Sequence, residues 1–165
     1  LGMALVVLVV MALDQASKYA MLELVDIDRR PAMHLCAYFT LVMAWNRGVS
    51  FSMLTSDAAP MPYVLASMAA LVSVVLWRQA WRTRRTAEWV AYTMVIGGAL
   101  GNALDRLRFG AVADFFYLHV GRYGWPAFNV ADMAICAGVV WLMGSALLGE
   151  KSPAAPCVPP SDQQA

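Results

Sequence analysis

Long apolar stretches separated by short polar segments dominate the chain. A helix needs about 20 apolar residues to cross roughly 30 Å of hydrocarbon, and four stretches reach or approach that length. They cover residues 1–22, 61–77, 89–104 and 130–148. The pattern therefore predicts an all-α membrane protein built as a bundle of four transmembrane helices. An even number of spans places both termini on one side of the membrane.

The charges between the second and third spans predict the orientation of the bundle. The segment RQAWRTRRT holds no acid and four arginines, Arg78, Arg82, Arg84 and Arg85. By the positive-inside rule this segment lies in the cytoplasm, and both termini lie there with it. Residues 23–60 and 106–128 then face the outside. Three arginines on that outer side run against the rule, namely Arg106, Arg108 and Arg122.

The first outer segment contains a stretch that resembles a β-strand. Residues 36–45, CAYFTLVMAW, are rich in β-branched, aromatic and apolar side chains, which favours a strand lying at the membrane surface. The NRG sequence at 46–48 predicts a turn, since Asn and Gly tolerate positive φ. We therefore expect a small extracytoplasmic β-platform within residues 24–60.

Residues 1–150 form a single predicted membrane domain. The remainder, 151–165, is rich in Pro, Ala and polar residues, which predicts a disordered cytoplasmic tail. The chain begins with Leu1 rather than Met, so we expect a few cytoplasmic residues to precede it. An alternative is that the first span is a cleavable signal peptide. Against this, no basic region precedes it, and Asp14 and Lys18 interrupt its apolar core.

The composition agrees with a membrane protein and excludes several classes of function. Hydrophobic residues make up 61% of the 165 residues and charged residues 14%, whereas soluble domains carry about 25% charged residues. A net charge of +1 without a basic face argues against a nucleic-acid partner. The two isolated histidines, His34 and His119, and the three scattered cysteines show no metal-ligand or redox spacing. We therefore expect no metal and no cofactor.

Ionisable side chains within the apolar stretches are the strongest functional signal. A charged side chain at the bilayer centre costs at least roughly 2.5–3.5 kcal/mol, so its presence there needs a reason. Asp14 and Lys18 are four residues apart on a predicted helix and can pair with each other. The favoured interpretation is a structural ion pair that tethers the first span. The alternative is a direct part in a reaction.

Two aspartates, Asp114 and Asp132, flank one outer loop near the ends of the third and fourth spans. Asp114 stands in an apolar run. The alternative to a functional role is that Asp114 is an acid of a solvated loop. For Asp132 the alternative is helix capping, because Asn129 lies three residues before it, as in a capping box. Spans joined by a short loop are neighbours, so both acids reach the same depth. If the two carboxyls come within hydrogen-bonding range, repulsion keeps one acid protonated and its partner ionised, which suits attack by water on an amide.

The end of the third span adds further polar groups to this region. The glycines of IGGALGNALDRLR, which allow a neighbouring helix to approach closely, are Gly97, Gly98 and Gly101. Asn102, Asp105 and Arg106 follow at the outer end. Arg106 either holds a carboxylate or extends along the apolar surface to water. Ser50 and Ser52 lack a histidine or lysine at a recognisable spacing, so no rival nucleophile is convincing.

Five strings, read in order, resemble the signal peptidase II family, also called lipoprotein signal peptidase. They are DQASK, NRGVSF, GGALGNALDR, GAVADF and FNVADMAI, and the resemblance runs from Asp14 to about Leu148. It implies an aspartic intramembrane endopeptidase of the bacterial inner membrane. Such an enzyme removes the signal peptide from diacylglyceryl-modified prolipoproteins, cleaves just before the lipidated cysteine, and is expected to be sensitive to globomycin.

The same resemblance implies roles for individual residues. Asp114 and Asp132 match the catalytic dyad, and Asp14 and Lys18 match the first-span motif. The residues that match polar, site-shaping positions are Asn46, Asn102, Arg106 and Asn129. The family also has a small extracytoplasmic β-platform. Two neighbours of the dyad depart from the family pattern, because Met133 replaces a small residue, often Ser, and Ala113 replaces a larger aliphatic one.

The hypothesis from the sequence is a metal-independent aspartyl protease that takes a lipid-anchored peptide sideways from the bilayer. The two acyl chains would contribute about 0.8 kcal/mol for each CH₂ that leaves water. One rival is a proton-coupled transporter, although both acids lie toward the outer ends of their spans and transporter sites commonly lie at the midplane. The second rival is a non-catalytic assembly protein whose acids only cap and pair.

Overall fold

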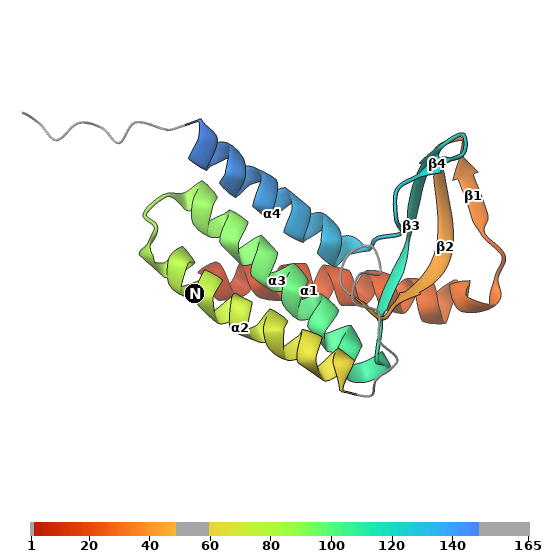
Figure 1. Ribbon diagram of the computed structural model, residues 1–165, viewed down its shortest axis with the longest axis horizontal. Helices are drawn as coiled ribbons and strands as arrows, with labels where there is room; N and C mark the ends of the chain where they lie inside the picture. Colours follow the sequence, from red (N-terminus) through yellow and green to blue (C-terminus); the bar gives the residue numbers. More distant parts are fainter. Residues whose placement is uncertain (1, 49–59, 149–165) are drawn as a thin grey trace, which may run out of the picture.

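The computed structural model describes residues 2–48 and 60–148. In this part of the chain four α-helices lie side by side, and a small sheet stands at one end of the bundle (Figure 1). The helices are α1 (Gly2–Tyr19), α2 (Met61–Arg82), α3 (Thr86–Phe109) and α4 (Val130–Leu147). A π-helical turn, Ala20–Leu24, continues α1. The four helices lie where the apolar stretches of the sequence predict them, and α2 and α3 extend several residues further.

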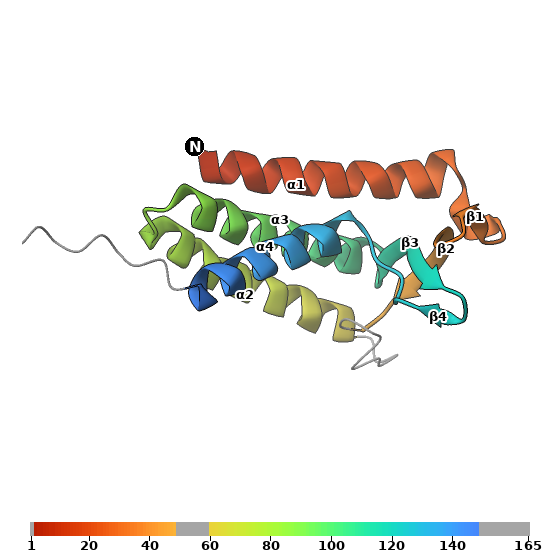
Figure 2. The ribbon, with the colours of Figure 1, turned by 90° about the horizontal axis from the view of Figure 1, so that it is seen from above.

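Helix α3 is the centre of the bundle. It packs against α1, α2 and α4, and Figure 2 shows it between α1 and α2. Within the described residues, three helical segments are long and apolar enough to cross a membrane, namely Gly2–Leu24, Met61–Arg82 and Val130–Leu147. Helix α3 is long enough, with 24 residues, but it carries several polar and charged side chains. The other helices cover many of these polar groups, which explains why α3 is less apolar than its neighbours. That α3 is a fourth span stays a prediction.

Small residues on α3 allow the helices to approach closely, as the sequence predicts. Gly97, Gly98 and Gly101 are all buried in α3. A Cβ placed on Gly98 would overlap the backbone carbonyl of Ala131 at the start of α4. This contact brings the first turn of α4 against α3, and Asp132 is part of that turn.

The platform is a four-stranded antiparallel sheet in the order β1, β2, β3, β4. Its strands are β1 (Met33–Cys36), β2 (Phe39–Asn46), β3 (Val112–Val120) and β4 (Tyr123–Gly124). The prediction of one strand over residues 36–45 is wrong in its extent, because the chain turns at Ala37 and Tyr38 and places Cys36 on β1. The predicted small β element is present, but its bounds, residues 24–60, were too narrow, because β3 and β4 lie in what the sequence suggested was an outer loop.

Two bends position the ends of the strands near the helices. Gly110 ends α3 with φ of 72°, a left-handed conformation that favours glycine, and β3 begins two residues later. After β2 the chain bends at Gly48, whose N–H donates to Oδ1 of Asn46 at 3.1 Å. The predicted turn at 46–48 is therefore present. Its expected cause was wrong, because positive φ among the described residues occurs only at Asp26, Gly110 and Gly121.

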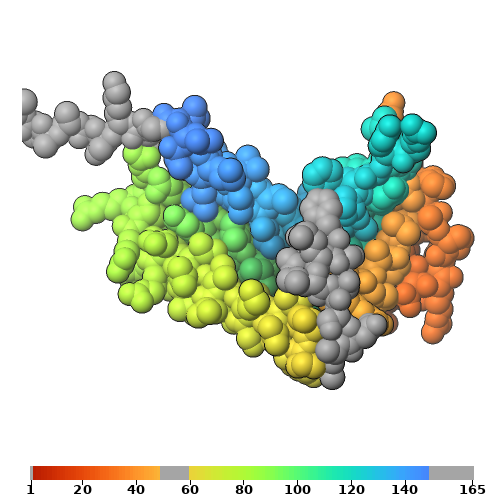
Figure 3. Space-filling model, viewed as in Figure 1, coloured from red at the N-terminus to blue at the C-terminus, as the bar shows by residue number. Residues whose placement is uncertain are grey.

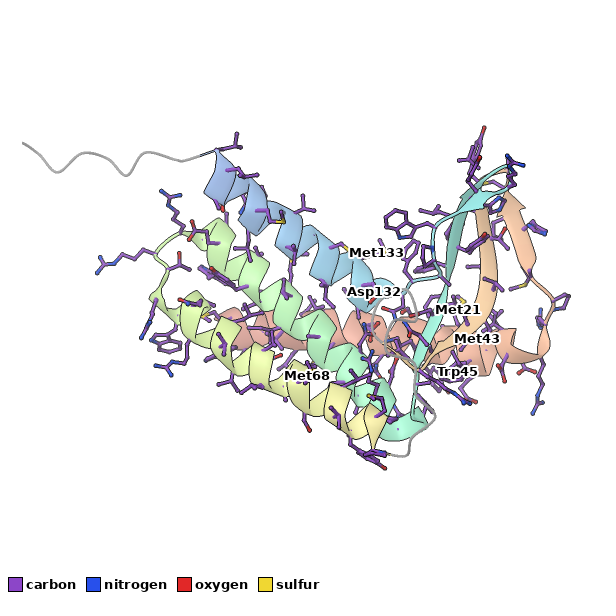
Figure 4. The ribbon with its side chains drawn as sticks, in the orientation of Figure 1. Met21, Met43, Trp45, Met68, Asp132 and Met133 are labelled. Carbon is purple, nitrogen blue, oxygen red and sulfur yellow. The ribbon has the colours of Figure 1, made fainter. Side chains whose placement is uncertain are left out.

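The sheet has its own apolar core next to the end of α1. Ile27, Leu41 and Phe115 are buried together, and partly buried side chains that include Met21 and Met43 pack against them. Figure 4 shows Met21 and Met43 at the base of the sheet. This core fixes the sheet to the bundle through both β2 and β3. The predicted tail, 151–165, and Ser50 and Ser52 lie outside the described residues.

Candidate active site

Asp114 and Asp132 line the same cavity, which has a volume of about 560 Å³. Asp132 is the third residue of α4, and in Figure 4 it lies at the end of that helix nearest the sheet. Asp114 is the third residue of β3 and pairs in register with Ala44 on β2. The expectation that both acids come from helices is therefore wrong for Asp114. The pairing of β2 with β3 positions this carboxylate beneath the platform and beside α4.

The cavity has a polar side and a large apolar remainder. The polar side chains that line it are Asn46, Asn102, Arg106, Asp114 and Asp132. Helices α2 and α4 supply apolar lining that includes Leu65, Met68, Val72, Met133 and Ile135. Figure 3 shows the surface hollowed between α4 and the sheet. The site thus places two carboxylates at one edge of an apolar recess.

Asp114 is a buried acid, so the alternative of a solvated loop acid is wrong. Its side chain is only 2% exposed. Oδ1 accepts from Nδ2 of Asn129 at 2.7 Å, and Oδ2 accepts from Nδ2 of Asn46 at 3.2 Å. Burial, and after it the charge of Asp132, raises the pKa of Asp114 from 3.8 to about 7, while the hydrogen bonds from Asn46 and Asn129 oppose the shift. Asp114 is therefore an acid that exchanges its proton near neutral pH.

Asp132 both caps its helix and faces the site. Its backbone N–H donates to Oδ1 of Asn129 at 3.0 Å, and the backbone N–H of Asn129 donates to Oδ2 of Asp132 at 3.3 Å. This is the reciprocal capping box that the sequence suggested as an alternative role. The other oxygen, Oδ1, accepts from Nδ2 of Asn102 at 2.9 Å. Capping does not remove Asp132 from the cavity, because the cap fixes the carboxylate at its edge.

Two asparagines connect the acids to each other. Nδ2 of Asn129 donates to Asp114, and it also lies 3.1 Å from Oδ1 of Asn102 and 3.2 Å from the carbonyl of Ala113. Asn129 is fully buried. It therefore binds the carboxylate of Asp114 through its side chain and that of Asp132 through its backbone N–H. Asn102 donates to the other oxygen of Asp132.

Comparison with known proteins identifies the family. The family model described as Signal peptidase (SPase) II matches residues 6–148. Two similar curated proteins are lipoprotein signal peptidases. The one from Beijerinckia indica is 37% identical and aligned over 86% of this chain and 85% of its own. The one from Methylorubrum extorquens is 41% identical over 82% and 80%.

The chain belongs to the signal peptidase II family. Members of this family are proteases that remove signal peptides from prolipoproteins. A solved structure described as a bacterial membrane enzyme has the same fold, with a TM-score of 0.79 at 21% identity over 93% of both chains. Membership in a protease family decides against the two rivals, a proton-coupled transporter and a non-catalytic assembly protein.

The predicted ion pair of Asp14 and Lys18 is present, and it is part of a larger polar cluster that also contains Asp105 and Gln15. Nζ of Lys18 lies 2.7 Å from Oδ2 of Asp14 and 2.7 Å from Oδ2 of Asp105. Gln15 joins the cluster by donating to Oδ1 of Asp105 at 2.9 Å. From the sequence, Asp105 was expected only as a polar group at the outer end of the third span, and no role was predicted for Gln15. Asp105 follows Asn102 by three residues on one helix, a spacing that places both on the same face.

Arg106 binds backbone carbonyls at the edge of the cavity. It donates to the carbonyl of Gly48 at 2.8 Å and to that of Asn102 at 3.2 Å. Its Nε is buried and has no partner among the described residues. These contacts oppose the alternative in which Arg106 extends to water. It joins the bend after β2 to α3, and so holds two walls of the cavity together.

The two histidines are isolated in sequence, but on the sheet both of them contact Thr40. Nδ1 of His34 and Nε2 of His119 each lie 2.9 Å from Oγ1 of Thr40. Their strands are neighbours of β2 on either side, which explains the contact. Across residues 2–48 and 60–148, no group of three or more His, Cys, Asp or Glu side chains is placed to hold a metal ion.

Proposed function

We propose that this chain is an aspartic protease in which Asp114 and Asp132 act together on a diacylglyceryl-modified prolipoprotein, cutting just before the lipidated cysteine. The observation that carries the proposal is that both carboxylates line one cavity and are both bound by Asn129. No resident metal or other cofactor is part of this mechanism.

The proposed chemistry needs one proton shared between the two acids. The raised pKa of Asp114, about 7, supports such sharing near neutral pH. The ionised member takes a proton from water as the water attacks the scissile carbonyl. The protonated member stabilises the oxyanion and then protonates the leaving amine. Because the pair titrates as a unit, we assign the shared proton to the pair and not to one acid.

The apolar remainder of the cavity supports a lipid-bearing substrate. Leu65, Met68 and Val72 on α2 face this space together with Ile135 on α4. A signal helix and acyl chains that enter sideways from the bilayer would be bound by contact with these side chains. The cyclic peptide globomycin, to which sensitivity is expected, would occupy the same space and block cleavage.

The proposed location is the bacterial inner membrane, with several spans, cytoplasmic termini and the site near the extracytoplasmic face. The arginines of the segment between α2 and α3 support this orientation, because that segment lies at the end of the bundle opposite the sheet (Figure 1). With α3 as a fourth span, residues 1–150 form one membrane protease domain and 151–165 a cytoplasmic tail.

The substrate proposal is tested by product analysis. Purified protein in detergent is offered a prolipoprotein peptide whose cysteine carries a diacylglyceryl group, and the matched peptide without the lipid. We expect mass spectrometry to show one product that begins with the lipidated cysteine, and little cleavage of the unmodified peptide. Equal cleavage of both peptides, or a cut at another bond, contradicts the proposed substrate.

A further inference from the structure

The amide of Asn102 has a defined orientation in the site. Its Oδ1 lies 3.1 Å from Nζ of Lys18, and its Nδ2 donates to Oδ1 of Asp132 at 2.9 Å. A lysine ammonium can only donate hydrogen bonds. Rotation of the amide by half a turn would direct its NH₂ group at the ammonium and its oxygen at the carboxylate of Asp132. Both new contacts are repulsive, so Lys18 favours the orientation in which Asn102 donates to Asp132.

Lys18 is itself held in place by a complete set of partners. Its side chain is nearly inaccessible, at 3% exposure, and its ammonium lies 2.7 Å from both Asp14 and Asp105. Asp14 and Asn102 accept hydrogen bonds from this ammonium, and the carboxylate of Asp105 forms a second ion pair with it. Asp14 also accepts from the backbone N–H of Ala131 at 3.0 Å, beside Asp132. The position of Lys18 is therefore determined from α1, α3 and the start of α4.

A second donor, Nδ2 of Asn129, also lies near Oδ1 of Asn102, but it cannot replace Lys18. The Nδ2 group of Asn129 has two hydrogens but three acceptors within reach, on Asp114, Asn102 and Ala113. The contact with Asp114 is the shortest, at 2.7 Å. Asn129 thus shares its two hydrogens among three acceptors, whereas the ammonium of Lys18 carries three hydrogens and donates one of them to Asn102.

We propose that Lys18 is a positioning residue for the dyad, acting through Asn102. By fixing the amide of Asn102, Lys18 keeps a hydrogen-bond donor on Asp132 and so keeps that carboxylate oriented toward the cavity. This inference rests on the proposed function, because it presupposes that Asp132 takes part in cleavage. It assigns Lys18 a role in turnover and not in substrate binding, since Lys18 does not line the cavity.

The test separates turnover from folding. Lys18→Met alone leaves two buried carboxylates without a cation. Lys18→Met is therefore also combined with Asp105→Asn, and this double variant is compared with the single variant Asp105→Asn. We expect the added Lys18→Met to lower kcat about 10- to 100-fold, the effect of losing one hydrogen bond to a charged group, while KM changes less than about twofold. Lys18→Arg, which keeps the charge, should recover part of the loss. Thr93→Val should retain wild-type kcat, because this buried α3 side chain donates to the carbonyls of Trp89 and Val90 in its own helix.

A double-mutant cycle distinguishes positioning from general support of the fold. When Asn102→Ala is already present, adding Lys18→Met should lower kcat no further, because the proposed effect passes through the amide of Asn102. An undiminished further loss of kcat, or a loss confined to KM, overturns the proposal. So does wild-type kcat in a folded Lys18→Met variant, with or without Asp105→Asn, where folding is judged by gel filtration and thermal unfolding. If a folded Asp132→Asn variant still cleaves, the proposed function itself fails, which is a different result from an active Lys18 variant.

Discussion

Asn129 donates from its side chain to Asp114 at 2.7 Å, and this residue is also the N-cap of the helix that carries Asp132. The two roles use different atoms of Asn129. Its Oδ1 accepts from the backbone of Asp132, and its Nδ2 serves Asp114. The geometry of the candidate dyad is therefore coupled to the start of α4.

Asn129→Ser separates these two roles, because serine also caps helices but lacks the NH₂ group. We expect unfolding stability close to that of the wild type, and a kcat that is lower by about 10- to 100-fold. Asn129→Ala loses the cap as well and should cost about 1 kcal/mol of stability. Steady-state cleavage and thermal unfolding in detergent measure both effects. A serine variant with wild-type kcat would show that the bond to Asp114 is dispensable.

The proton of Asp114 predicts how stability and cleavage depend on pH. A carboxyl whose pKa rises from 3.8 to about 7 on folding binds more protons in the folded protein between these values. This group therefore lowers stability as pH rises from about 4 to about 7, and its contribution is constant above that range. Thermal unfolding at several pH values should show Asp114→Asn gaining stability relative to wild type across this window. A difference that does not change with pH contradicts the assignment.

Cleavage should fall as pH rises above about 7, because the pair then loses its shared proton. The pH profile of kcat for the wild-type protein tests this directly. A profile that stays flat from pH 6 to pH 9 would mean that no acid with the pKa of Asp114 limits turnover.

Met133 is predicted to affect binding rather than turnover. It lies beside Asp132, half exposed, and lines the cavity together with Met68 of α2 (Figure 4). Met133→Ser removes apolar contact area, so KM for the lipidated peptide should rise about 3- to 10-fold, at roughly 0.8 kcal/mol per lost CH₂ contact. The control is Met143→Ser, on the same helix and similarly exposed but outside the cavity lining. Equal effects of the two substitutions would remove Met133 from the substrate site.

Gly98→Ala tests the packing that positions the first turn of α4. The added methyl would overlap the carbonyl of Ala131, which is backbone and cannot move aside alone. We expect a loss of stability of about 1–3 kcal/mol, together with reduced cleavage. The matched control is Gly144→Ala in α4, where a Cβ meets nothing within 4 Å. If both variants unfold at the same temperature, the close contact of α3 with α4 is not required.

Several features of this protein were predictable from local patterns. Apolar runs identify helices because each run has the length of a span, and the capping box of Asn129 and Asp132 is readable from a spacing of three residues. The family resemblance singled out both acids. The expectation that they lie near each other rested on a short loop between the third and fourth spans, whereas that connection holds the strands β3 and β4.

Strand β3 was missed because its sequence does not alternate between apolar and polar residues and because its partner strand is distant in the sequence. Residues 112–115, VADF, are all buried, so the strand does not show the alternation of a half-buried edge. Its partner β2 lies some 70 residues earlier, since Ala44 pairs with Asp114. For the same reason the sequence could not show that Asp105 of α3 meets Lys18 of α1. Such contacts depend on the rotation of one helix against another, which only packing determines.

The central claim is that Asp114 and Asp132 both carry out the cleavage. The most direct measurement compares wild type, Asp114→Asn and Asp132→Asn, purified in detergent, on the diacylglyceryl-modified peptide. The control is Asp26→Asn, the same chemical change at a half-exposed acid with φ of 51°, a conformation that asparagine tolerates. We predict that the control cleaves like wild type, while each folded dyad variant loses at least about 99% of the activity, as expected when a reacting group is removed. Substantial cleavage by either dyad variant would contradict the account.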